Sequence, residues 1–65
     1  MKPVEYYRRR KELEMSQREL AVWLGVSKST VERRESGVSR INHEAQLALE
    51  RTRELQRVRA AQARA

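Results

Sequence analysis

Polar side chains that form strong hydrogen bonds are concentrated between residues 28 and 36, where the only large apolar residue is Val31. A helix built from this stretch would turn most of its surface toward solvent or a ligand. Arginine can donate hydrogen bonds to O6 and N7 of guanine, and glutamate can accept a hydrogen bond from N4 of cytosine. Lysine and hydroxyl groups can form hydrogen bonds with bases or phosphates. This chemistry matches a helix that enters the major groove of B-DNA. The polar side chains are Lys28, Ser29, Thr30, Glu32, Arg33 and Arg34.

The overall charge favours an anionic partner. Fifteen lysines and arginines stand against nine acidic residues, which gives a net charge of +6 and a pI near 10.8. Charge alone does not distinguish nucleic acid from an anionic lipid surface. A membrane-surface hypothesis applies to the arginine-rich stretch from Arg51, but the apolar side of that stretch is too thin to anchor well. We therefore expect no membrane partner.

Several functional classes lack the residues they need. The chain has no cysteine, and its only histidine, His43, is expected at the surface, so we expect no metal and no other cofactor. The sequence offers no nucleophile beside a base and no glycine-rich phosphate loop, and so small a core leaves little room for a ligand pocket. We expect neither enzymatic activity nor a small-molecule ligand. No apolar run approaches the roughly 20 residues that span a bilayer, and we expect a cytoplasmic location.

Two short helices joined by a tight turn are predicted in the middle of the chain. Ser16 caps the first of them, which begins at Gln17 and stops before Gly25, because glycine adopts the left-handed conformation that ends a helix without strain. Ser27 caps the second, which covers residues 28–36. A turn of about three residues forces two such helices to cross steeply.

Longer helices are predicted on both sides of this pair. Charged helix formers run from Val4 to about Glu14. Asn42 is a fair cap for a final helix over residues 42–62, which has apolar positions in a three-four rhythm on one face. A fifth helix, separated by a slight break near Thr52, stays open as an alternative.

Residues 17–36, QRELAVWLGVSKSTVERRES, resemble the helix-turn-helix of Cro and the lambdoid phage repressors, which is of the XRE type. The likeness extends outward to Leu13 and Gly37, which fall where that family places core and cap residues. It implies an all-α fold, a compact four- to five-helix repressor-like bundle with a long C-terminal helix, in a single domain over residues 1–65. It further implies a sequence-specific transcriptional regulator, a repressor that binds double-stranded DNA as a homodimer on an inverted-repeat operator through the helix that begins at Lys28.

The same resemblance assigns individual DNA contacts. The residues expected to contact base edges are Lys28, Ser29, Glu32 and Arg33. Glu32 has an alternative role, which is to orient Arg33. The residues expected to bind phosphates are Gln17, Arg10, Thr30, Arg34 and Arg40. In repressors of this type the places of Arg10 and Glu35 carry a partly buried ion pair, which we predict here as well.

Three residues depart from the family's pattern. Val22 and Trp23 stand at outward places of the second helix where the family normally has polar residues. Two interpretations of Trp23 stay open: it packs against the first helix or Tyr7, or it forms a protein contact or dimer patch. Arg34 stands where many relatives have an aromatic or aliphatic residue, and we expect it to contact another phosphate or to lay its stem over Trp23.

The last helix is the predicted dimer element. The residues expected to form the dimer or another protein contact are Trp23, Leu47, Leu55 and Val58. An alternative function is that of a protein-binding adaptor or a sequence-blind nucleic-acid binder, which would use Trp23 and the basic C-terminal helix. A palindromic consensus from random-sequence DNA would favour the regulator, and salt-sensitive binding without sequence preference would favour the alternative.

Overall fold

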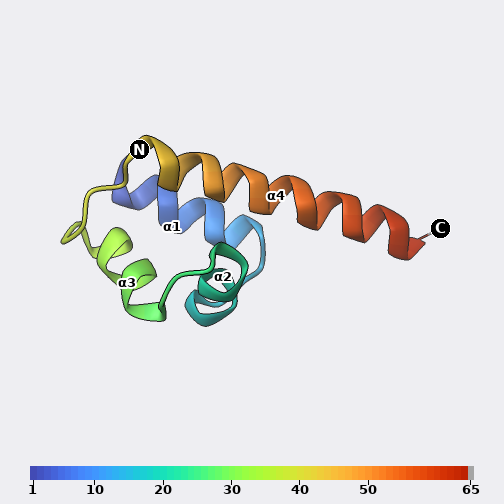
Figure 1. The fold of residues 1–65 in the computed structure, drawn as a ribbon, viewed down its shortest axis with the longest axis horizontal. Helices are drawn as coiled ribbons and strands as arrows, with labels where there is room; N and C mark the ends of the chain where they lie inside the picture. Colours follow the sequence, from blue (N-terminus) through green and yellow to red (C-terminus); the bar gives the residue numbers. More distant parts are fainter. Residues whose placement is uncertain (65) are drawn as a thin grey trace.

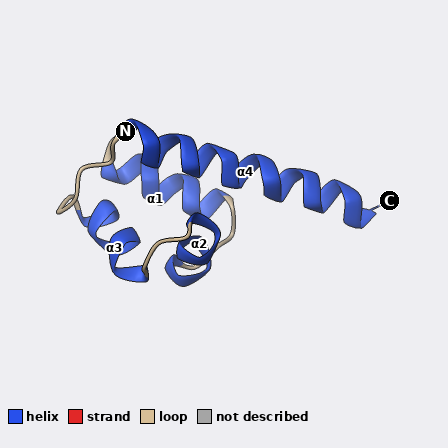
Figure 2. Cartoon of the chain, viewed as in Figure 1, coloured by secondary structure: helices blue, strands red, loops and turns tan. Residues whose placement is uncertain are grey.

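Four helices make up the part of the chain that the computed structural model describes, residues 1–64 (Figure 1). Between them run only short loops and turns, and this part of the chain contains no strand (Figure 2). The helices are α1 (Pro3–Glu12), α2 (Gln17–Leu24), α3 (Lys28–Ser36) and α4 (His43–Arg64). The all-α fold predicted from the sequence is therefore confirmed.

Side-chain caps fix where three of these helices begin. Ser16 Oγ accepts a hydrogen bond from the Glu19 amide at 3.1 Å, and Ser27 Oγ accepts one from the Thr30 amide at 3.3 Å. Asn42 Oδ1 accepts from the amide of Ala45 at 2.8 Å. Each cap satisfies a backbone donor that the first helical turn leaves without a partner. The predicted starts of α2 and α3 are confirmed, and α4 begins at His43, directly after its predicted cap, and ends at Arg64 rather than at residue 62.

Left-handed residues mark where the first three helices end. Gly25 and Gly37 have φ angles of +71° and +85°, a region that glycine enters without steric cost. Glu14 also lies there, with φ of +57°. Its conformation turns the chain away from α1, which ends at Glu12, two residues before the predicted Glu14. No glycine signals this turn in the sequence.

The buried core draws apolar side chains from all four helices and from the loops between them. Its members are Tyr6, Leu13, Met15, Leu20, Ala21, Val31, Ile41, Ala45 and Leu49. α2 packs against both α3 and α4, and α1 packs against α3. The amide of Val26 donates to the Ala21 carbonyl at 3.0 Å, which holds the turn between α2 and α3 against the end of α2. α3 contributes a single large side chain, Val31, to this core, and that side chain packs α3 against the other helices.

α4 is one continuous helix that extends beyond the rest of the molecule (Figure 1). It passes Thr52 without a break, so the alternative of a fifth helix is wrong. Thr52 is itself buried and its hydroxyl donates to the Ala48 carbonyl at 2.9 Å. Gln56 still contacts the loop after α1, because its Nε2 donates a hydrogen bond to the Leu13 carbonyl at 3.1 Å. Beyond it, residues 57–63 are all exposed. None of the helices within residues 1–64 is long and apolar enough to cross a membrane.

Candidate nucleic-acid interface

α3 turns two different faces to its surroundings. Val31 is fully buried, and Arg34 and Glu35 are partly buried toward the other helices. The side chains on the opposite side of the helix are exposed. These exposed residues are Lys28, Ser29, Glu32, Arg33 and Ser36. We call the first side the inner face of α3 and the second its outer face.

An ion pair between Arg10 and Glu35 holds the inner face against α1. Arg10 Nε lies 2.7 Å from Glu35 Oε2, and its Nη2 donates to Oε1 at 3.0 Å. The two side chains are only 9% and 8% exposed. Such a bidentate arrangement joins guanidinium and carboxylate in a fixed orientation. The predicted ion pair is therefore confirmed, and it links two helices that are far apart in the sequence.

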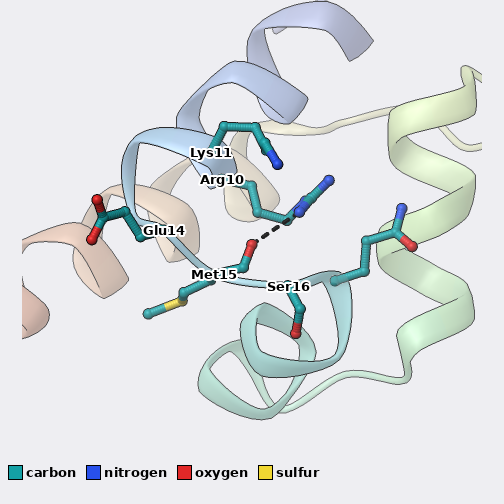
Figure 3. A pocket seen from close by; sticks show the side chains of 6 residues that line it. Arg10, Lys11, Glu14, Met15 and Ser16 are labelled. Carbon is teal, nitrogen blue, oxygen red and sulfur yellow. Dashed lines mark hydrogen bonds between the residues drawn. The ribbon is translucent and has the colours of Figure 1, made fainter.

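Further contacts surround Arg10 and its partner Glu35. Its Nη1 donates to the Met15 carbonyl at 2.9 Å, beside an open depression between α1 and α2 (Figure 3). Gln17 adds a bond from its Nε2 to Glu35 Oε1 at 3.3 Å. The guanidinium of Arg10 also lies 5.2 Å from the centre of the Tyr7 ring, within the range of a cation–π contact. Arg10 is thus buried and bonded within the protein, and the phosphate contact predicted for it stays a prediction.

Electrostatics reinforce this arrangement. The hydrogen bonds that Arg10 donates to Glu35 raise the pKa of Arg10 above its ordinary value, although burial acts on the same pKa in the opposite direction. The negative charge of Glu35 raises it further. Arg10 therefore stays protonated in its pair with Glu35.

Arg34 contacts Tyr6 of α1, and Trp23 packs against the core. Arg34 Nη1 donates to the Tyr6 hydroxyl at 3.2 Å, and its guanidinium lies 5.9 Å from the centre of the Tyr6 ring. The expected stem over Trp23 and the phosphate contact of Arg34 both stay predictions. Trp23 is partly buried and packs against the core, which favours the packing interpretation, whereas its neighbour Val22 is 77% exposed.

The outer face of α3 carries an ion pair of its own. Lys28 Nζ lies 3.2 Å from Glu32 Oε1, with the two side chains 50% and 48% exposed. Glu32 thus pairs with Lys28, and its alternative role of orienting Arg33 stays a prediction. The i, i+4 spacing of lysine and glutamate could have revealed this pair in the sequence. Ser29 and Arg33 are exposed beside it.

The other predicted phosphate contacts lie in α3 and in the segments next to it. Thr30 is partly buried and its hydroxyl lies 3.0 Å from Ser27 Oγ, close to the start of α3. Gln17, also partly buried, stands at the start of α2, and Arg40 is exposed in the loop between α3 and α4. The structure therefore brings polar groups from three segments to the vicinity of α3. Their contacts with phosphate stay predictions.

The predicted dimer residues of α4 lie apart from this interface. Leu47, Leu55 and Val58 are 48%, 48% and 45% exposed, although all three are large and apolar. The core side of the same helix carries Ala45, Leu49 and Thr52.

Within residues 1–64 no group of histidine, cysteine, aspartate or glutamate side chains has an arrangement suited to a metal ion.

Comparison with known proteins gives one match. Residues 7–51 match the family model HTH_3, whose description is "Helix-turn-helix". The matched span contains all of α2 and α3, both partners of the buried ion pair and the first part of α4. The curated proteins and the solved structures contain no match.

Proposed function

This chain belongs to the helix-turn-helix family HTH_3, a family of XRE-type DNA-binding regulators of transcription, and from that premise we propose that it is a sequence-specific repressor. It would bind an inverted-repeat operator as a homodimer, with α3 of each copy in the major groove. Repression would follow from occupancy of the operator. The observation that carries this proposal is the division of α3 into a fixed inner face and an exposed polar outer face.

The outer face supplies the base contacts in this proposal. Its side chains project from a helix of the width that a major groove admits, and they include donors and an acceptor. Arg33 would bond O6 and N7 of a guanine, and Ser29 would contact a neighbouring base. Lys28 and Glu32 complete the set. The buried ion pair on the inner face keeps this helix in place while its outer side chains meet the DNA.

Phosphate contacts would fix the position of α3 along the duplex. Gln17 and the free amides at the start of α2 would bind one phosphate, as helix N-termini commonly do. Thr30, Arg34 and Arg40 would bind others, and the net charge of +6 would attract the protein to the backbone. Contacts of this kind raise affinity without selecting a sequence.

A second copy of the chain would pair through α4. Leu47, Leu55 and Val58 are exposed on it, and burial of such side chains between two copies is the usual source of association free energy. A two-fold axis would place the two α3 helices about 34 Å apart, one helical turn of DNA, with half-site centres about 10 bp apart. This spacing is what an inverted-repeat operator requires.

Selection from random-sequence DNA tests the proposal. We expect a palindromic consensus, because two related copies of α3 would contact the two half-sites. Salt-sensitive retention of DNA without any consensus would contradict it and support a sequence-blind binder. Light scattering of the protein with and without the selected duplex would then show whether two copies bind.

Arg33→Ala sharpens this test at one residue. Loss of its guanidinium should flatten the preference at one base pair of each half-site by about 1 to 3 kcal/mol, because a bidentate contact to guanine is removed. Arg59→Ala, an exposed arginine of α4, is the matched control and should leave every base preference unchanged. An unchanged consensus for Arg33→Ala would remove its assigned role.

A further inference from the structure

The ion pair on the outer face of α3 presents a hydrogen-bond donor directly beside an acceptor. Lys28 Nζ and Glu32 Oε1 are 3.2 Å apart, one helical turn from each other and half-exposed. Their neighbours on this face, Ser29 and Arg33, are exposed as well. The ammonium and the carboxylate therefore form a compact unit that faces outward from the helix, where the proposed function places base pairs.

A G·C base pair offers the complementary arrangement in the major groove. Guanine O6 is an acceptor and cytosine N4 is a donor, and these two atoms are hydrogen-bonded to each other within the pair, so they lie about 2.9 Å apart. An ammonium above O6 and a carboxylate above N4 would then be separated by nearly the distance found between Lys28 and Glu32. Both bases could be bonded without disrupting the ion pair.

We propose that Lys28 and Glu32 act as one unit that recognises a single G·C base pair in each half-site. This inference rests on the proposed function and specifies how its outer face selects DNA. Lys28 donates to O6 of the guanine, with N7 as a second acceptor beside it, and Glu32 accepts from N4 of the cytosine. The unit is directional, because the reversed pair would place the ammonium over the amino group of cytosine.

An A·T pair fits the same unit less well. The amino group of adenine, its N6, lies between two acceptors, N7 of adenine and O4 of thymine. A carboxylate that accepts from N6 would meet an acceptor on both sides. At cytosine N4 only one side carries an acceptor, O6 of guanine. The unit therefore discriminates G·C from A·T in two ways. It is attracted to the G·C pair, and its carboxylate is repelled by the acceptors on both sides of adenine N6.

Pairing with Lys28 also explains how a carboxylate is tolerated at this surface. DNA carries a dense negative charge, which would repel an isolated glutamate from the groove. The adjacent ammonium compensates that charge, so Glu32 can approach the bases as part of a neutral unit. Removal of either partner should therefore disturb the same base contact, and this expectation separates a joint role from two independent roles.

Selection from random-sequence DNA with three proteins tests the inference. The wild type should select a G·C pair at one position of each half-site. Lys28→Ala and Glu32→Ala should each relax the preference at that same position, by about 5- to 150-fold. Relaxation at two different positions, or a wild-type consensus with no G·C pair that responds to both variants, would overturn the inference. A palindromic wild-type consensus would still support the proposed function in that case, whereas no consensus at all would sink the proposed function itself.

A change in the DNA gives a measurement that does not depend on a variant protein. Replacement of the selected cytosine by 2-pyrimidinone removes its amino group and should weaken wild-type binding, while Glu32→Ala should bind both duplexes equally. An equal loss for both proteins would contradict a contact from Glu32 to N4. Glu54→Ala is the matched control, since it breaks the exposed pair with Arg57 on α4 and should leave every base preference unchanged.

Discussion

α3 carries one ion pair on each of its two faces, and the pairs differ in nearly every physical respect except their charges. On the inner face, Arg10 and Glu35 are joined at 2.7 Å with side chains less than a tenth exposed. On the outer face, Lys28 and Glu32 are joined at 3.2 Å and each is about half-exposed. The inner pair links two helices, and the outer pair stays within one helix.

Burial decides what each pair can do. A buried charge that loses its partner is left without solvation, so neither residue of the inner pair can be replaced alone without a large loss of stability. An exposed pair exchanges its partner for water at little cost, so the outer pair contributes little to folding and is free to meet a ligand. The molecule thereby separates the residues that hold α3 from those proposed to select DNA.

The largest expected effect comes from Arg10→Met. The substitution leaves Glu35 charged and buried and also removes the donor to the Met15 carbonyl. We expect a loss of about 3 to 5 kcal/mol in the free energy of unfolding. A domain of this size has about that much in total, so the variant should be largely unfolded at 25 °C. Circular dichroism with urea titration measures the effect.

Two controls accompany this variant. Arg8→Met removes an exposed arginine from the same helix and should change stability by less than about 0.5 kcal/mol. Arg10→Met combined with Glu35→Leu removes both charges and should recover part of the lost stability. A loss of less than about 1 kcal/mol in the free energy of unfolding for Arg10→Met alone would show that the inner pair contributes no more to stability than the outer pair does.

An intermediate effect is expected from Ser27→Ala at the start of α3. Ser27 Oγ accepts from the Thr30 amide, and its loss should lower the free energy of unfolding by about 1 kcal/mol. Ser29→Ala is the matched control, because Ser29 is exposed within the helix and alanine is the better helix former. Equal urea midpoints for the two variants would contradict a structural role for the cap.

The smallest effect on stability is expected from Lys28→Ala combined with Glu32→Ala. An exposed i, i+4 pair contributes about 0.3 to 0.5 kcal/mol, and alanine's helix propensity offsets part of that loss. Thermal unfolding of the double variant should therefore nearly coincide with that of the wild type. A loss above about 1 kcal/mol would mean that the outer pair also holds the fold, and the contrast between the two faces would fail.

Local signals account for the part of the fold that could be predicted. Ser16, Ser27 and Asn42 set helix starts through bonds within three residues, and glycine at two ends needs no distant partner. The end of α1 was placed two residues too late because Glu14 adopts a left-handed conformation that its residue type does not signal. Thr52, near which the alternative of a fifth helix placed a break, is buried within the continuous α4, and its residue type does not signal that burial.

Tertiary contacts supply what local patterns could not predict at the candidate site. The resemblance gives Arg10 two roles, an ion pair and a phosphate contact; the structure confirms the first, and the second stays a prediction. The contact of Arg34 with Tyr6 joins residues in different helices, which no local pattern reveals. The pairing of Lys28 with Glu32 could have been predicted from the sequence, because residues four apart in a helix lie next to each other.

The projecting end of α4 offers a practical route to measurement. Ala61 is exposed there, and because the chain has no cysteine, Ala61→Cys would create a single attachment point for a dye or a solid support. This end of α4 lies at the far side of the molecule from α3 (Figure 1). A molecule attached at that point would therefore leave the outer face of α3 open to its ligand.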